Sequence, residues 1–202
     1  MRCDSITSKY NILQTNTANE AYKALEKVNE TLDLVRNDTY QWKWAIIILH
    51  NCVQCFMVLC LEGTNQVDVI KDKTKDKKRI KAHLTHIIED WKEPQLDDFL
   101  SLYRKVKVSL SLKNELDVNI VTINDFRNDF IHYFPKGWSL FTDGLPAVFH
   151  NILYIIEMII LRSDRIIYKY NDNQKSELKR LIYEIKSKLS DMNPSYQSIY
   201  TD

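Results

Sequence analysis

Arg127, Asn128 and His132 form the group of side chains in this sequence best suited to chemistry on a phosphate. An imidazole can accept or donate a proton near neutral pH, and a guanidinium can hold a phosphate through two parallel hydrogen bonds. An adjacent amide can orient either group. The three side-chain types fit RNA cleavage without a metal ion. The histidine would exchange a proton with the ribose 2′-hydroxyl while the arginine stabilises charge developing on the phosphate.

The residues around this group predict a helix over about 121–134, which Pro135 ends because proline cannot continue the hydrogen-bond ladder. One face of this helix carries an apolar stripe that we assign to the core. The stripe consists of Ile123, Phe126, Phe130 and Phe134. Asn128 and His132 lie four residues apart on the opposite face.

Arg127 and His132 point about 140° apart around an ideal helix, so one straight helix does not bring both to the same phosphate. Two arrangements would bring them together. The helix end before Pro135 could be irregular, or a two-fold dimer could supply the partner group from a second copy. We expect a homodimer with two such faces near each other.

The segment from Arg127 to His132 resembles the R-x4-H motif of HEPN domains, in which a polar residue often follows the arginine. Its place in the chain, late in a helical bundle and before a long apolar helix, is also similar. The resemblance implies a dimeric, metal-independent endoribonuclease in which Arg127 holds the scissile phosphate, His132 is the general base or acid, and Asn128 assists. Phe134 departs from the R-x4-H-x-Y pattern of HEPN toxins paired with nucleotidyltransferase antitoxins.

The same resemblance implies RNA as the substrate and a role as a toxin or antiviral effector, with an antitoxin or regulatory protein as a partner. Other members of the superfamily are inactive. The alternative is therefore a non-catalytic helical module that dimerises or interacts through the same face. The accessibility of Arg127 and His132 in one cleft distinguishes the two interpretations.

Composition predicts an all-α fold. The chain has 202 residues, 45% of them hydrophobic, but 3 glycines and 4 prolines, too few for the many turns of a β or doubly wound α/β protein. We expect one compact bundle of about six to seven helices over 18–190, a loosely ordered lead-in over 1–17 and a frayed tail over 191–202. Apolar spacing places the helices at about 18–37, 40–62, 80–91, 96–108, 121–134, 145–169 and 174–190, with 109–120 as a connection.

The net charge of +1 provides no global field that would attract nucleic acid, so any RNA contact must be local. The segment 71–81 is rich in lysine and is either a solvated loop or a phosphate-binding patch. The weaker RNA-binding candidates are Lys77, Lys78, Arg79 and Lys136.

We predict no metal and no cofactor. Cys52 and Cys55 form a C-x2-C pair, but no second pair lies at the spacing of a zinc site. His83, His86 and Asp90 lie on adjacent turns of one predicted helix and could together bind a metal. Their presence is better explained by a charged surface helix. The sequence contains no glycine-rich phosphate loop.

The most apolar segment, 44–61, is nearly long enough to cross a membrane, but polar residues interrupt it, so we interpret it as a buried bundle helix. His50 and His150 lie in apolar helices and are expected to be core histidines. His50 and Asn51 could instead line the cleft of Arg127. Cysteines expected to be buried and reduced, together with a polar N-terminus, predict a cytoplasmic protein without a membrane segment.

Overall fold

The structure is a computed structural model that describes residues 13–63, 67–71, 95–132, 137 and 139–192. This part of the chain is helical, and its single β-type pairing is an isolated antiparallel bridge between Ile70 and Leu96. The elements are α1 (Thr17–Val35), α2 (Gln41–Leu61), η1 (Val67–Val69), α4 (Phe99–Leu110), η2 (Asn114–Leu116), α5 (Asp117–Ile131), α6 (Leu145–Arg162), α7 (Asp164–Ile167) and α8 (Asp172–Met192). The predicted all-α class is confirmed.

Several sequence predictions fall on residues outside these ranges. They concern the helix expected at about 80–91 and the histidine pair within it, and the position of Phe134 in the core stripe. The weaker RNA-binding candidates Lys77, Lys78, Arg79 and Lys136 also lie outside the described residues.

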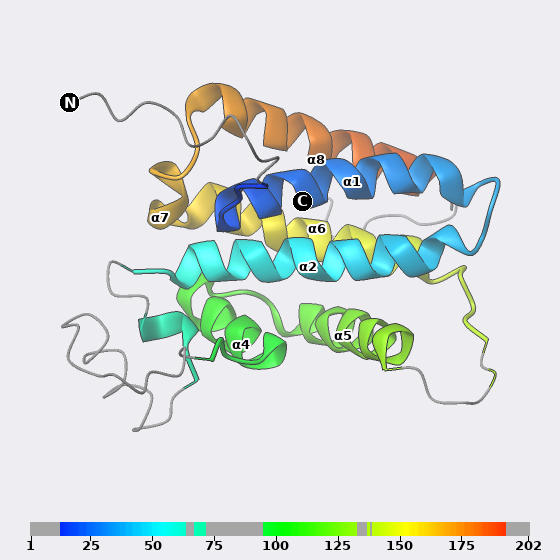
Figure 1. Cartoon of the computed structure of the whole chain (residues 1–202), viewed down its shortest axis with the longest axis horizontal. Coiled ribbons are helices and arrows are strands. Elements are labelled where there is room, and N and C mark those ends of the chain that lie inside the picture. Colours follow the sequence, from blue (N-terminus) through cyan, green and yellow to red (C-terminus); the bar gives the residue numbers. More distant parts are fainter. Residues whose placement is uncertain (1–12, 64–66, 72–94, 133–136, 138, 193–202) are drawn as a thin grey trace.

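Helix α2 is the centre of the bundle. In Figure 1 it runs between α1 and α8 on one side and α4 and α5 on the other, and it contacts α1, α4, α5, α6 and α7. Its buried side chains extend from Trp42 to Leu61 and occupy most of its circumference. A helix that is apolar nearly all round must be covered by neighbours, as the sequence predicted.

Helix α1 packs one apolar stripe, which includes Leu25, Val28 and Leu32, and pairs with α2 across a short turn. Its N-cap is Asn16, whose side-chain oxygen accepts a hydrogen bond from the Asn19 backbone at 2.9 Å.

Helix α5 begins earlier than predicted, at Asp117, within the segment expected to be a connection. Helix α4 ends at Leu110, and its C-cap Ser111 has a φ of 52° in the left-handed region. The chain turns there, and fully buried Leu116 anchors the start of the next helix in the core. Lys107 of α4 binds the Asp117 carboxylate at 2.7 Å, and a carboxylate is favoured in the first turn of a helix.

Helix α6 ends at Arg162, not near 169 as predicted, because Ser163 leaves the helical conformation with a ψ of 112°. The short helix α7 then turns toward the end of α2. Arg165 donates a hydrogen bond to the Leu61 carbonyl, and Lys169 binds Glu62 at 3.2 Å. The Arg165 side chain thus satisfies one of the carbonyls at the C-terminal end of α2, which has no further helical turn to do so.

Two of the described helices, α2 and α6, are long and apolar enough to cross a membrane by length and composition alone. Their most apolar windows are 61% and 56% buried inside the bundle, respectively. Core helices of this length commonly meet the same criteria, so this observation is weak evidence for a membrane span.

Candidate functional site

The C-terminal end of α5 carries Arg127 and Asn128, and His132 follows directly after the helix. Arg127 and Asn128 are half-buried, and Nη1 of Arg127 donates a hydrogen bond to Oδ1 of Asn128 at 3.0 Å. The Asn128 amide therefore lies within reach of the guanidinium and can orient it.

His132 lies just beyond the helix. Its backbone amide makes the last helical hydrogen bond, to the Asn128 carbonyl at 2.8 Å, but its own φ and ψ of −94° and 75° are not helical. The side chain is exposed and makes no hydrogen bond or ion pair within the described part of the chain. The chain thus leaves the helical conformation at His132.

The core stripe of α5 is strongest in the middle of the helix. Ile123 is fully buried, whereas Phe126 and Phe130 are half-buried and pack against the edge of the core. The assignment of this face to the core is confirmed, although the aromatic residues were expected to lie deeper. The end of α5 that carries Arg127 is therefore more accessible than its first turns.

Arg127 lines an open groove of about 430 Å³ between α1, α2 and α5. Helix α2 contributes His50, Asn51 and Gln54 to this groove, and α1 contributes Lys23 and Lys27. His132 is not among the lining residues. The structure therefore places Arg127 beside His50 rather than in one groove with His132.

His50 is buried at the base of this groove. Its ring stacks on Phe99 with centroids 3.9 Å apart and an interplanar angle of 21°. Its Nε2 atom lies 3.4 Å from Oδ1 of Asn124 on α5. An amide oxygen is an acceptor, so this contact requires the tautomer of His50 that carries its proton on Nε2.

Burial lowers the pKa of His50 to about 4. The hydrogen bond to Asn124 opposes this change and the nearby charge of Arg127 adds to it. The ring is therefore neutral at physiological pH and is a weak base there. His50 satisfies both sequence expectations: it is a core histidine with a hydrogen-bond partner, and together with Asn51 it lines the groove of Arg127.

Asn124, Lys23, Lys27 and Gln54 were not identified from the sequence. A signal existed for Asn124, because it lies three residues before Arg127 and so shares a side of α5 with it. Lys23 and Lys27 lie four residues apart on α1, but that spacing is common in any solvated helix. Their position opposite Arg127 depends on how α1 packs on α2.

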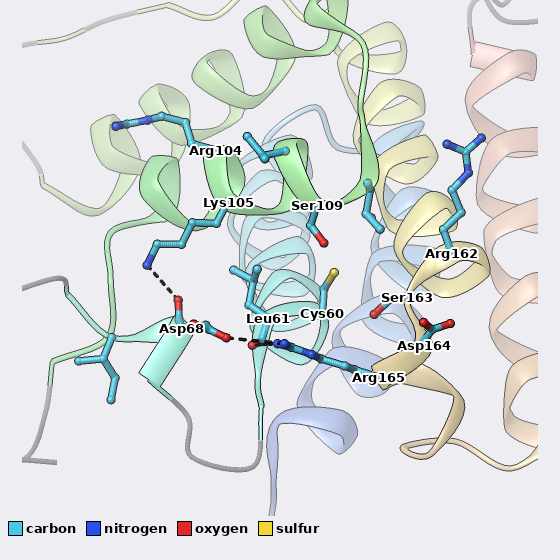
Figure 2. A pocket seen from close by; sticks show the side chains of 13 residues that line it. Cys60, Leu61, Asp68, Arg104, Lys105, Ser109, Arg162, Ser163, Asp164 and Arg165 are labelled. Carbon is cyan, nitrogen blue, oxygen red and sulfur yellow. Dashed lines mark hydrogen bonds and ion pairs between the residues drawn. The ribbon is translucent and has the colours of Figure 1, made fainter. Parts of the chain in front are cut away.

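A second pocket of about 790 Å³ lies at the other end of α2, between α4, η1 and the junction of α6 with α7 (Figure 2). Two of its cations are already paired: Lys105 with Asp97 at 2.8 Å and Arg165 with Asp68 at 3.6 Å. In Figure 2, Arg104 and Arg162 extend away from the centre of the pocket, toward which Ser109 and Cys60 point. These contacts join η1 and α7 to the end of α2 and do not assemble a reactive group.

The described cysteines lie on α2, where Cys52 and Cys60 are buried and Cys55 is half-buried. Burial raises the pKa of all three thiols, that of Cys55 to about 11, so they are protonated at neutral pH and poor metal ligands. Among the described residues, no three His, Cys, Asp or Glu side chains cluster as metal ligands would.

No protein-family model, curated protein or solved structure matches this chain.

Proposed function

We propose that this protein is a metal-independent endoribonuclease of the HEPN type that acts as a homodimer. The observation that supports this most directly is the state of Arg127. Its guanidinium lines an open groove and, within the described residues, hydrogen-bonds to Asn128 and has no acidic partner. An arginine that is not neutralised by a carboxylate can bind a phosphate through two parallel hydrogen bonds.

The reaction would proceed by attack of the ribose 2′-hydroxyl. His132 takes the proton of this hydroxyl, and the oxygen bonds to the adjacent phosphorus. The bond between phosphorus and the 5′-oxygen then breaks, leaving a 2′,3′-cyclic phosphate. The leaving oxygen receives a proton from a water molecule, and the protonated His132 then neutralises the hydroxide that remains. Arg127 stabilises the charge on the phosphate, and Asn128 orients the guanidinium.

The homodimer follows from the separation of the groups. His132 is exposed and lies outside the groove of Arg127, so a single copy presents them on different surfaces. Two copies related by a two-fold axis through the ends of their α5 helices would bring the Arg127 of one near the His132 of the other. A cytoplasmic toxin or antiviral effector, controlled by an antitoxin or regulatory protein, is the biological role that accords with such an enzyme.

The test is incubation of the purified protein with mixed RNA in EDTA. Wild type should produce fragments with 2′,3′-cyclic phosphate or 3′-phosphate ends, and His132→Ala should not. His150→Ala is the matched control, because His150 lies on α6 and does not line the groove. Loss of wild-type cleavage in EDTA with recovery on adding a divalent ion would refute the mechanism.

A non-catalytic interaction module is the second candidate. It is favoured by the apolar residues Val118 and Val121 of α5, which are 65% and 42% exposed. Side chains of this kind on one helix surface suit a protein interface. A stable dimer that leaves RNA intact under all the conditions above would support this candidate.

A further inference from the structure

The groove of Arg127 continues toward the N-terminus of α1. A second hollow of about 410 Å³ adjoins it and reaches Thr15 and Leu96. The two hollows share Glu20, Asn51 and Gln54 as lining residues, so they form one continuous depression, here called the α1–α2 groove. On α2 it extends from Ile47 to Val58, or ~16 Å at the usual rise per residue.

The two halves of the α1–α2 groove differ in charge. The half near Arg127 also contains Lys23 and Lys27, and Glu20 is its one acidic lining residue. Both lysines bind acids one turn away on α1, Glu26 at 2.6 Å and Glu30 at 2.8 Å. Such exposed ion pairs contribute little, so the ammonium groups can exchange them for phosphate oxygens.

The other half has no basic lining residue. Its wall includes the apolar side chains Val58 and Leu96, and Leu96 is 41% exposed. Its acid, Glu20, accepts a hydrogen bond from Thr15 at 2.6 Å. An apolar wall beside uncharged polar groups suits the flat face and polar edge of a nucleic-acid base better than a phosphate.

Asn51 and Gln54 lie where the two halves meet. They are three residues apart on α2 and therefore on one side of it. Neither side-chain amide makes a hydrogen bond within the described residues. An amide offers a donor and an acceptor side by side, and this pair matches the amino group and ring nitrogen of adenine.

We propose that the α1–α2 groove binds single-stranded RNA and that Asn51 and Gln54 select an adenine next to the phosphate held by Arg127. The base occupies the half without basic residues, and the backbone leaves past Lys23 and Lys27. A single strand is required, because in a duplex the edge of each base is paired and its faces are stacked on neighbouring bases. The inference rests on the proposed function, which assigns the scissile phosphate to Arg127.

Binding is measured apart from cleavage by using short 2′-O-methyl RNA, which lacks the nucleophilic hydroxyl. Fluorescence anisotropy compares an oligonucleotide containing adenines with one of the same length containing uridines. We expect wild type to bind the first about tenfold more tightly, and Asn51→Ala/Gln54→Ala to bind both alike. The control is Asn114→Ala/Asn173→Ala, which removes two exposed amides outside the groove and should keep the preference.

Each outcome is decisive for the inference. Equal affinity of wild type for both oligonucleotides, no binding, or a preference that survives Asn51→Ala/Gln54→Ala overturns it. The proposed function is tested separately by cleavage of unmodified RNA. If adenine preference depends on Asn51 and Gln54 but no RNA is cleaved, the groove binds RNA as proposed and the proposed enzyme activity is wrong. If cleavage depends on His132 but binding shows no adenine preference, the enzyme activity is supported and the proposed base selection is wrong. Thermal melts establish that both double variants are folded.

Discussion

Nε2 of His50 lies 3.4 Å from Oδ1 of Asn124, and this contact joins the central helix to α5 one turn before Arg127. The contact lies at the base of the groove, where His50 is also stacked on Phe99 of α4. Three helices therefore meet at one neutral imidazole, which lines the same groove as the guanidinium proposed to bind phosphate. A polar contact held by packing on both sides is a rigid support for the end of α5.

Replacing His132 should separate activity from stability. His132→Ala should abolish RNA cleavage, since proton transfer by a positioned side chain contributes ~10²–10⁴-fold. It should change the free energy of unfolding by less than about 1 kcal/mol, because the side chain is exposed. The reference is Ile123→Ala on the same helix, which should cost about 2–5 kcal/mol because Ile123 is fully buried. Thermal melts and cleavage assays on both variants are required, and unfolding of His132→Ala would disprove the assignment of faces.

Mixed dimers test whether Arg127 and His132 act from different copies. Arg127→Ala and His132→Ala should each be inactive alone. After unfolding and refolding together, half of the dimers are mixed and one of their two sites is intact, so cleavage should return to about one quarter of the wild-type rate. Cleavage that stays absent in a mixture shown by mass spectrometry to contain mixed dimers would place both groups in the same copy.

Arg127→Lys tests whether cleavage requires the planar guanidinium or only a positive charge at this position. Lysine keeps the positive charge but cannot form two parallel hydrogen bonds to one phosphate, so cleavage should fall about 10²–10³-fold, the loss typical of one missing transition-state donor. Arg104→Lys, in the second pocket, is the control and should cleave at the wild-type rate. Single-turnover rates measure the effect, and near-wild-type cleavage by Arg127→Lys would show that charge is sufficient.

The sequence predicted the helices best where apolar spacing is long and regular. The boundaries of α2 were predicted within one residue, because a run of buried side chains defines both ends. The start of α5 was missed because its anchor is Leu116, a single buried residue after a left-handed turn at Ser111. The end of α6 was missed because Ser163 is ordinary in a helix, and contacts of Arg165 with α2 redirect the chain there.

Only the part of the candidate site that lies on one helix could be predicted from the sequence. Residues of one helix, such as Arg127 and Asn128, can be grouped from spacing alone. Their neighbours on other helices depend on packing angles that no local pattern encodes. The contribution of His50 was therefore an open alternative, and that of Asn124 was not identified.

The burial of His50 predicts a specific pH dependence of stability. Its pKa is about 4 in the folded protein, lowered mainly by burial, whereas an unfolded chain has the ordinary histidine value of about 6.5. Between these values the unfolded chain binds a proton that the folded protein does not. Stability from His50 is therefore complete above pH 6.5 and falls with pH by about 1.4 kcal/mol per unit, reaching a loss of about 3 kcal/mol near pH 4.

His50→Gln isolates this contribution, because glutamine does not titrate and its amide can still donate to Asn124. The variant should be less stable than wild type at pH 7.5, since it loses the ring stacked on Phe99. The difference in unfolding free energy between the two proteins should shrink as the pH is lowered from 6.5 to 4.5, because only wild type loses the contribution of His50. Carboxylate titrations are common to both proteins and cancel in the comparison. Urea denaturation at each pH measures it, and the His50 ring signals in NMR spectra should not titrate above pH 5. A His50 titration midpoint near 6.5, or parallel stability curves, would mean that the imidazole is hydrated and is not buried between Phe99 and Asn124.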